Sequence, residues 1–362
     1  MRFIHLSDVR IGQHTESGRP WAGARVSEVA ATLGKVAQAA EERRIDIVLI
    51  AGGLFAHRPV TAELEEANRV FAEHPGTVFV IAAGESDRVR KNSPVLSFNW
   101  APNVHYCLSG RGEKLTFPNI STVVYTRSVT EEAASGEELI ALLETDTAAS
   151  DVPVIRVGME AIPSAEEATH YCSSGFSYVA LGGIPTYTEV MKDRVYYSGG
   201  AEPEGMTDTG VHGFVQGEIS PVTGTVTSLN FVPMASASYV PLLIRINTSV
   251  TPDMFRDMIR QEILRRGESN IYRVRITGQK LPEFRFDLSD LRKEFRITEV
   301  MDEAEPQYDF EGLYEEHQQD MIGYFISSLR RKRQDLPDID KKAMFQGIDA
   351  LLRTSEEEGR QA

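Results

Sequence analysis

The first hundred residues alternate between two patterns of apolar positions. Short apolar runs at residues 2–6, 46–51 and 77–82 predict buried β-strands. Residues 26–43 and 61–73 instead place apolar side chains every three or four positions, which predicts amphipathic helices. Strands that alternate with helices in this way form a parallel sheet with crossover helices, so we expect an α/β fold.

Strand patterns dominate the middle of the chain. They lie at residues 121–126, 152–157, 177–181, 195–198, 213–219 and 225–232. A stretch rich in Pro, Ala and Ser follows at residues 232–238 and predicts a linker. Beyond it, strand patterns alternate with helical ones, which predicts a small α/β domain. The expected parts are residues 1–235, residues 236–304 and residues 305–362.

Two helices are predicted after residue 305, and both have an apolar stripe with three- and four-residue spacing. The stripe consists of Phe310, Leu313, Tyr314, His317, Met321, Tyr324, Phe325 and Leu329, and after Pro337 of Met344, Ile348, Leu351 and Leu352. So many apolar and aromatic residues on terminal helices favour binding to a partner protein. The alternative is that both helices fold back on their own domain.

Composition narrows the class of protein. The 362 residues carry a net charge of -15, which gives no overall attraction to DNA, so we expect DNA contact only weakly or through a partner. Basic patches at residues 43–44, 88–91 and 330–333 are candidates for phosphate contact or are solvated helix ends. The two cysteines lack metal-site spacing, and no apolar run is long enough for a signal peptide or a membrane span. We expect a soluble, cytoplasmic protein.

Four segments carry a resemblance to a known family. Residues 2–12, 48–55, 84–88 and 178–185 resemble, in order and spacing, the motifs of the calcineurin-like metallophosphoesterases, and most closely those of SbcD-type nuclease subunits. Residues 197–214 are similar to the Pro-Gly-Ser-x-Glu-Pro stretch and the following hairpin of these proteins. The resemblance implies a sandwich of two mixed sheets flanked by helices, a capping domain, a C-terminal helical hairpin and a homodimer.

The metal-ligand positions of the family are almost all substituted. Asp8 keeps the residue of the first motif, and Asp87 keeps the acid at the end of the third. The remaining positions are Arg10 for a His, Gly53 for an Asp, Glu85 for an Asn, Ser86 for a His, Gly158 or Met159 for a His, and Gly183 and Pro185 for the last two His.

These substitutions predict that no metal cofactor is bound. Glycine and proline side chains offer no ligand, and the permanently charged guanidinium of Arg10 repels a divalent cation. We expect Arg10 to pair with Asp8, Glu85 or Asp87 in the space that the ions occupy in the family. The alternative is a rebuilt site in which Asp8, Glu85, Asp87 and His57 hold one manganese or other divalent ion.

The resemblance implies a catalytically inactive SbcD-like subunit. Such a subunit would act as a scaffold for an SbcC-like coiled-coil ATPase in DNA repair, DNA processing or defence, gripping the base of the coiled coil with its C-terminal helices. Two alternatives stay open: an active, divergent metal-dependent phosphoesterase or DNA exonuclease, and a free-standing binding module.

Overall fold

The structure is a computed structural model that describes residues 1–131, 138–146, 155–162, 164–332 and 345–352. Its contacts divide the chain into two compact units. The first unit comprises residues 1–240 and 269–271, and the second comprises residues 241–268 and 272–362. Each unit is described by itself below.

The first sheet of the first unit is mixed, with six strands in the order β12-β11-β1-β2-β3-β4. Strands β1 to β4 run parallel to one another, whereas β11 is antiparallel to both of its neighbours. The bounds are β1 (Arg2–Leu6), β2 (Ile47–Ala51), β3 (Val78–Ala82), β4 (Val104–Tyr106), β11 (Gly213–Ile219) and β12 (Val226–Pro233). Every residue of β2 is buried, as expected for a central strand covered on both faces.

The second sheet is also mixed and has the order β5-β6-β7-β8-β10-β9. The four inner strands are parallel, and the two edge strands pair antiparallel. The bounds are β5 (Glu113–Phe117), β6 (Thr122–Thr126), β7 (Ile155–Ala161), β8 (Tyr178–Gly182), β9 (Thr188–Met191) and β10 (Val195–Tyr197).

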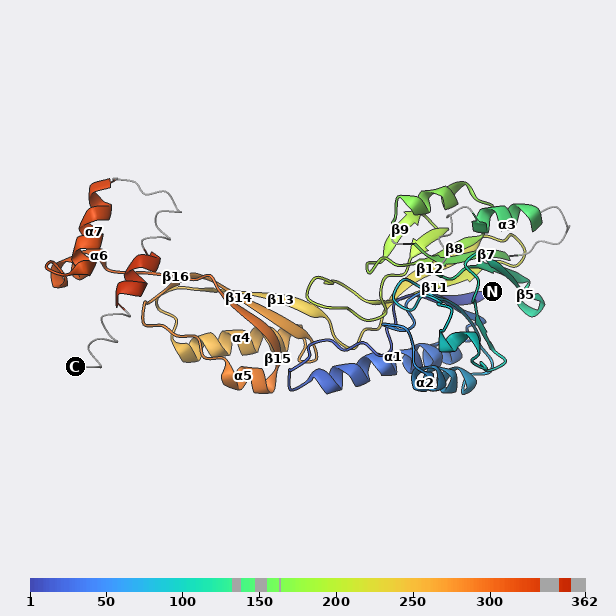
Figure 1. The fold of residues 1–362 in the computed structure, drawn as a ribbon, viewed down its shortest axis with the longest axis horizontal. Helices are drawn as coiled ribbons and strands as arrows, with labels where there is room; N and C mark the ends of the chain where they lie inside the picture. Colours follow the sequence, from blue (N-terminus) through green and yellow to red (C-terminus); the bar gives the residue numbers. More distant parts are fainter. Residues whose placement is uncertain (132–137, 147–154, 163, 333–344, 353–362) are drawn as a thin grey trace. The chain divides into compact units, whose positions relative to one another are not determined.

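Helices cover the outer face of each sheet, which gives four layers (Figure 1). Helices α1 (Ala22–Glu42) and α2 (Thr61–Ala72) pack on the first sheet. Helix α3 (Glu138–Asp146) and the 3-10 helix η3 (Glu167–Ser173) pack on the second. Short 3-10 turns, η1 (Pro94–Leu96) and η2 (Pro118–Ile120), lie in connections. The unit is therefore an α/β sandwich of two mixed sheets flanked by helices, as the sequence predicts.

Strand β1 shows how the alternation of side chains builds these layers. Phe3 points into the core between the two sheets, whereas Ile4 and Leu6 point into the core beneath α1 and α2. Both cores are made of fully buried aliphatic and aromatic residues. This packing fixes where β1 ends and therefore where the loop that follows it begins.

The second unit contains a sheet in the order β13-β14-β15, with β16 paired to β14. The bounds are β13 (Tyr239–Ile246), β14 (Ile271–Lys280), β15 (Arg296–Asp302), β16 (Glu305–Pro306), α4 (Pro252–Arg266) and α5 (Ser289–Glu294). The Thr251 hydroxyl caps α4 by accepting a hydrogen bond from the Met254 backbone N–H at 3.3 Å. Phe255, Ile259 and Ile263 follow one another at four-residue spacing and form the buried face of α4.

The C-terminal region differs from the two-helix prediction. The stretch predicted as one helix from Phe310 to Leu329 is split into α6 (Phe310–Glu316) and α7 (Met321–Lys332). The break arises because Asp320 caps a new helix by accepting the backbone N–H groups of Ile322 and Gly323 at 2.9 and 3.2 Å. Residues 345–352 form a further helical segment.

Within the described residues, no helix combines the length and the apolar character that crossing a membrane requires.

Candidate functional site

Most of the positions that the resemblance identifies lie on loops at one edge of the sandwich. Asp8 and Arg10 follow β1, Gly53 follows β2, and residues 84–87 follow β3. These three strands are parallel neighbours, so their carboxyl ends lie together. β8 of the second sheet ends at the same edge, because a Cβ added to Gly182 would lie 1.7 Å from a backbone oxygen at the end of β2.

Asp8 and Gly53 are in direct contact, which leaves no room for a side chain at position 53. A Cβ on Gly53 would lie 2.4 Å from Asp8 Oδ1 and 2.9 Å from Asp8 Cα. Gly53 also has a φ of 68°, which favours glycine. The position at which the family carries an aspartate ligand therefore accepts only glycine in this conformation.

Arg10 occupies the space beside Asp8, as predicted. Its Nη1 lies 3.4 Å from Asp8 Oδ1 and 3.0 Å from Glu204 Oε1. Burial raises the pKa of Asp8 above its ordinary value and Glu204 adds to the rise, while the guanidinium of Arg10 opposes both. Asp8 and Arg10 also have positive φ angles of 50° and 59°, so two strained residues meet here.

Asp87 is fully buried, and its side chain binds backbone N–H groups of two loops. Its carboxylate accepts hydrogen bonds from the N–H groups of Gly84 at 2.7 Å, Gly53 at 3.3 Å and Phe55 at 3.2 Å. Burial raises its pKa to about 6, against the effect of these three donors. The neighbouring Ser86 hydroxyl donates to the Phe55 carbonyl at 2.9 Å. Both side chains join the loop after β3 to the loop after β2.

Glu85 and His57 point elsewhere. Glu85 is 73% exposed and forms an ion pair with Arg88 in its own turn. His57 Nε2 lies 3.5 Å from Glu63 Oε1, and its Nδ1 lies 2.9 Å from the Arg58 carbonyl oxygen. Among the described residues, no three His, Cys, Asp or Glu side chains come together in a way that could hold a metal ion. The alternative ligand set is therefore not assembled in this structure.

Gly158 is buried beside the Phe176 ring, whereas Gly183 and Pro185 are exposed. A Cβ on Gly158 would touch the Phe176 ring at 3.3 Å, within the core on the outer side of the second sheet. A Cβ on Gly183 would lie 3.0 Å from the Ile162 carbonyl oxygen. The Pro185 carbonyl accepts the Gly200 N–H at 2.9 Å. None of these three positions offers a side-chain ligand.

A buried ion pair near this edge has no signal in the sequence. Arg25 of α1 and Glu202 are 1% and 0% exposed, with Nη1 and Oε2 2.9 Å apart. Glu202 Oε1 also accepts the Thr32 hydroxyl at 2.8 Å and the Ser236 backbone N–H at 2.9 Å. This one carboxylate holds α1, the loop after β10 and the segment after β12 together.

A buried acid and imidazole, Asp208 and His212, lie next to Gly200. His212 Nε2 is 3.4 Å from Asp208 Oδ1, and His212 Nδ1 is 3.2 Å from the Gly200 carbonyl oxygen. A Cβ on Gly200 would lie 3.6 Å from His212 Nδ1 and 3.8 Å from Asp8 Cβ. His212 and Asp8 therefore both lie beside Gly200.

Two other buried titratable groups have structural partners. His5 is bonded to the Tyr178 hydroxyl at 2.9 Å and the Leu181 carbonyl at 3.0 Å, and burial lowers its pKa to about 3. Glu160, at the end of β7, is held by Arg127 and by the Tyr171 hydroxyl. Burial raises the Glu160 pKa, and Arg127 opposes that rise. Both groups stabilise the second sheet.

The residues predicted to bind a partner divide into two sets. Phe310, Leu313, Tyr314, Phe325, Ile348, Leu351 and Leu352 of the predicted stripe pack in a small apolar cluster, together with Tyr308, Ile322, Ile326 and Phe345, which were not part of the prediction. Met321 and Tyr324 of α7 stay 69% and 73% exposed. They are three residues apart and so lie on one face of the helix. Leu329 falls within α7, whereas Met344 lies outside the described residues.

The three acids at or near the sheet edge all have partners within the first unit. Asp8 is paired with a cation, Asp87 is saturated by backbone donors, and Glu202 is neutralised by Arg25. A scan of protein-family models finds no match to the chain, and no curated protein matches it either.

Proposed function

We propose that this chain is a catalytically inactive, SbcD-like member of the calcineurin-like metallophosphoesterases. It acts as a scaffold for an SbcC-like coiled-coil ATPase in DNA repair, DNA processing or defence. The observation that carries the proposal is the contact between Gly53 and Asp8, with Arg10 alongside. A two-metal hydrolase needs several ligands around two ions at this edge, and here main chain and a guanidinium fill the space.

The fold and the order of the motifs support the family part of the proposal. The sandwich has two mixed sheets between layers of helix, and the four motif segments that carry the resemblance lie at or next to strand ends in both sheets. Asp8 and Asp87 keep their place on loops after β1 and β3. A fold that keeps its motif loops but not its metal-ligand residues is what we expect of a subunit retained for assembly.

The exposed face of α7 supports the scaffold part. Met321 and Tyr324 present two large apolar side chains to solvent from a helix whose Ile322, Phe325 and Ile326 pack in the apolar cluster. Aromatic residues in such positions are common anchors in protein interfaces. The extensive packing of the cluster behind them favours the second candidate, a free-standing module whose terminal helices complete their own core.

Binding to the cognate coiled-coil ATPase discriminates between the two. The variants Met321→Glu and Tyr324→Glu should each weaken co-elution with the ATPase by about tenfold or more, because each places a charge at an interface anchor. The matched control is Met254→Glu on α4, where the side chain is 50% exposed. Wild-type binding by both α7 variants, or no binding by the unmodified chain, would refute the scaffold function.

A further inference from the structure

A cavity in the first unit, distinct from the Asp8 edge, has the size of a small-molecule site. Its volume is about 800 Å³, within the range of roughly 300–1,000 Å³ that is typical of ligand pockets. The residues that line it come from three segments of the chain. These are residues 89–96, residues 108–111, and Thr130 and Glu131 together with Glu138. None of its lining residues belongs to the sheet-edge positions described above.

The walls of this cavity are fixed to one another by backbone hydrogen bonds. The Val89 N–H donates to the Val129 carbonyl at 2.9 Å, and the Ser128 N–H donates to the Ser109 carbonyl at 2.9 Å. The Ser128 hydroxyl donates to the Cys107 carbonyl at 2.6 Å. These bonds tie the loop after β3 and the loop after β4 to the same segment after β6, so the cavity is preformed.

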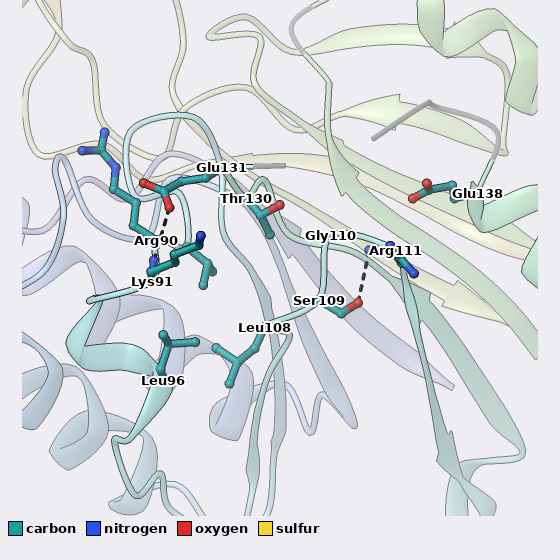
Figure 2. A pocket seen from close by; sticks show the side chains of 11 residues that line it. Arg90, Lys91, Leu96, Leu108, Ser109, Gly110, Arg111, Thr130, Glu131 and Glu138 are labelled. Carbon is teal, nitrogen blue, oxygen red and sulfur yellow. Dashed lines mark hydrogen bonds between the residues drawn. The ribbon is translucent and has the colours of Figure 1, made fainter. Parts of the chain in front are cut away.

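Three cationic residues are among those that line the cavity, and all three are exposed to solvent. Arg90 and Lys91 come from one loop and Arg111 from another, with Leu96 below them (Figure 2). In the part of the chain that the structure describes, none of the three cationic groups forms an ion pair. Arg88, two residues before Arg90, is by contrast neutralised by Glu85.

Two carboxylates complete the polar lining. Glu131 accepts the Lys91 backbone N–H at 3.4 Å. Glu138 Oε2 is buried and has no hydrogen-bond partner among the described residues. Three cations against two carboxylates leave a surplus of one positive charge in a chain whose net charge is -15. A buried acceptor without a partner is unfavourable, and a ligand hydroxyl or amine would satisfy it.

We propose that this cavity binds a nucleotide. Phosphate groups match the surplus of cations, because guanidinium groups bind phosphate oxygens through charge-assisted hydrogen bonds. The apolar side chains of Val89, Leu96 and Leu108 offer a surface for a base. The free oxygen of Glu138 accepts a ribose hydroxyl or a base amine. One ligand class supplies all three groups within the available volume.

Calorimetric titration of the full chain with ATP in EDTA tests the proposal. We expect saturable binding that weakens by about tenfold or more in Arg90→Gln and in Arg111→Gln. Arg88→Gln, which removes the same charge two residues away, should change the affinity by less than about twofold, because Arg88 does not line the cavity. Leu96→Glu, at a side chain that is 44% exposed, should also weaken binding without disturbing the core.

Three results would overturn the proposal. They are the absence of saturable ATP binding, equal affinities for the wild type and both arginine variants, and capture of a labelled single-stranded oligonucleotide that ATP does not displace. Displacement of the oligonucleotide by ATP would support the site. The assay contains no ATPase, and its variants lie outside the sheet edge and α7, so its outcome is independent of the scaffold function.

Discussion

Replacement of Arg25 by methionine should destabilise the first unit strongly. The change removes the counter-ion of Glu202, whose side chain is fully buried, and leaves its charge held only by the Thr32 hydroxyl and the Ser236 N–H. Breaking one partner of a buried pair typically costs about 3–5 kcal/mol. Because two hydrogen bonds to Glu202 survive, we expect a loss of free energy of unfolding near the lower end, about 3 kcal/mol.

The double variant Arg25→Met with Glu202→Gln shows how much of the lost stability comes from the unpaired charge of Glu202. A glutamine keeps an oxygen to accept from Thr32 and Ser236 but carries no charge, so the double variant should recover about 2 kcal/mol relative to Arg25→Met alone. Arg69→Met is the matched control, since Arg69 pairs with Glu66 and Glu73 on the exposed surface of α2. It should leave the unfolding midpoint unchanged.

Urea unfolding followed by tryptophan fluorescence measures these differences. Both tryptophans of the chain, Trp21 and Trp100, belong to the first unit, so the signal reports this unit. The reasoning is wrong if Arg25→Met loses no more stability than the exposed control. It is equally wrong if the double variant is no more stable than Arg25→Met.

Two further predictions concern the sheet edge. Arg10→Ala should lower the free energy of unfolding by about 1–2 kcal/mol. The loss is smaller than for a fully buried pair because the side chains of Arg10 and Asp8 are 19% and 15% exposed. A thermal unfolding midpoint equal to that of the wild type would show that Arg10 does not pair with Asp8. Because the folded-state pKa of Asp87 is raised to about 6 from 3.8, its stabilising contribution is full below pH 3.8 and is lost as the pH rises through 6. Wild-type stability should therefore fall over this window by on the order of 2–3 kcal/mol relative to Asp87→Asn, and parallel pH profiles of the two proteins would contradict the assignment.

Much of the fold follows from apolar periodicity, and the missed edge strands lack it. Strands β2 and β3 are continuous apolar runs, β1 is mostly apolar, and all three were predicted to within one residue. β5 and β9 were not predicted, because edge strands are held by backbone pairing and carry mixed sequences such as Glu-Lys-Leu-Thr-Phe. Helix α3 was also missed, although the four-residue spacing of its buried Leu139 and Leu143 is visible in the sequence.

At the candidate site, too, some contacts were predicted from the sequence and others could not be. An ion pair of Arg10 with Asp8, Glu85 or Asp87 was predicted from the ligand position that Arg10 occupies in the resemblance, and the structure pairs it with Asp8. The contribution of Glu204 could not be predicted, because the fold brings it from a loop nearly two hundred positions away. The hydrogen bonds to Asp87 come from backbone N–H groups, which every residue except proline carries and which therefore leave no signature in a sequence.

The central claim is that the edge beside Asp8 is closed to metal ions. Titration of the purified full chain with Mn²⁺, followed by the electron paramagnetic resonance signal of the free ion, tests it most directly. We expect the signal to rise in proportion to the added Mn²⁺ from the first addition, as it does in buffer. Tight uptake of one or two ions per chain that is lost in Asp8→Ala would contradict the account and would point to an active phosphoesterase.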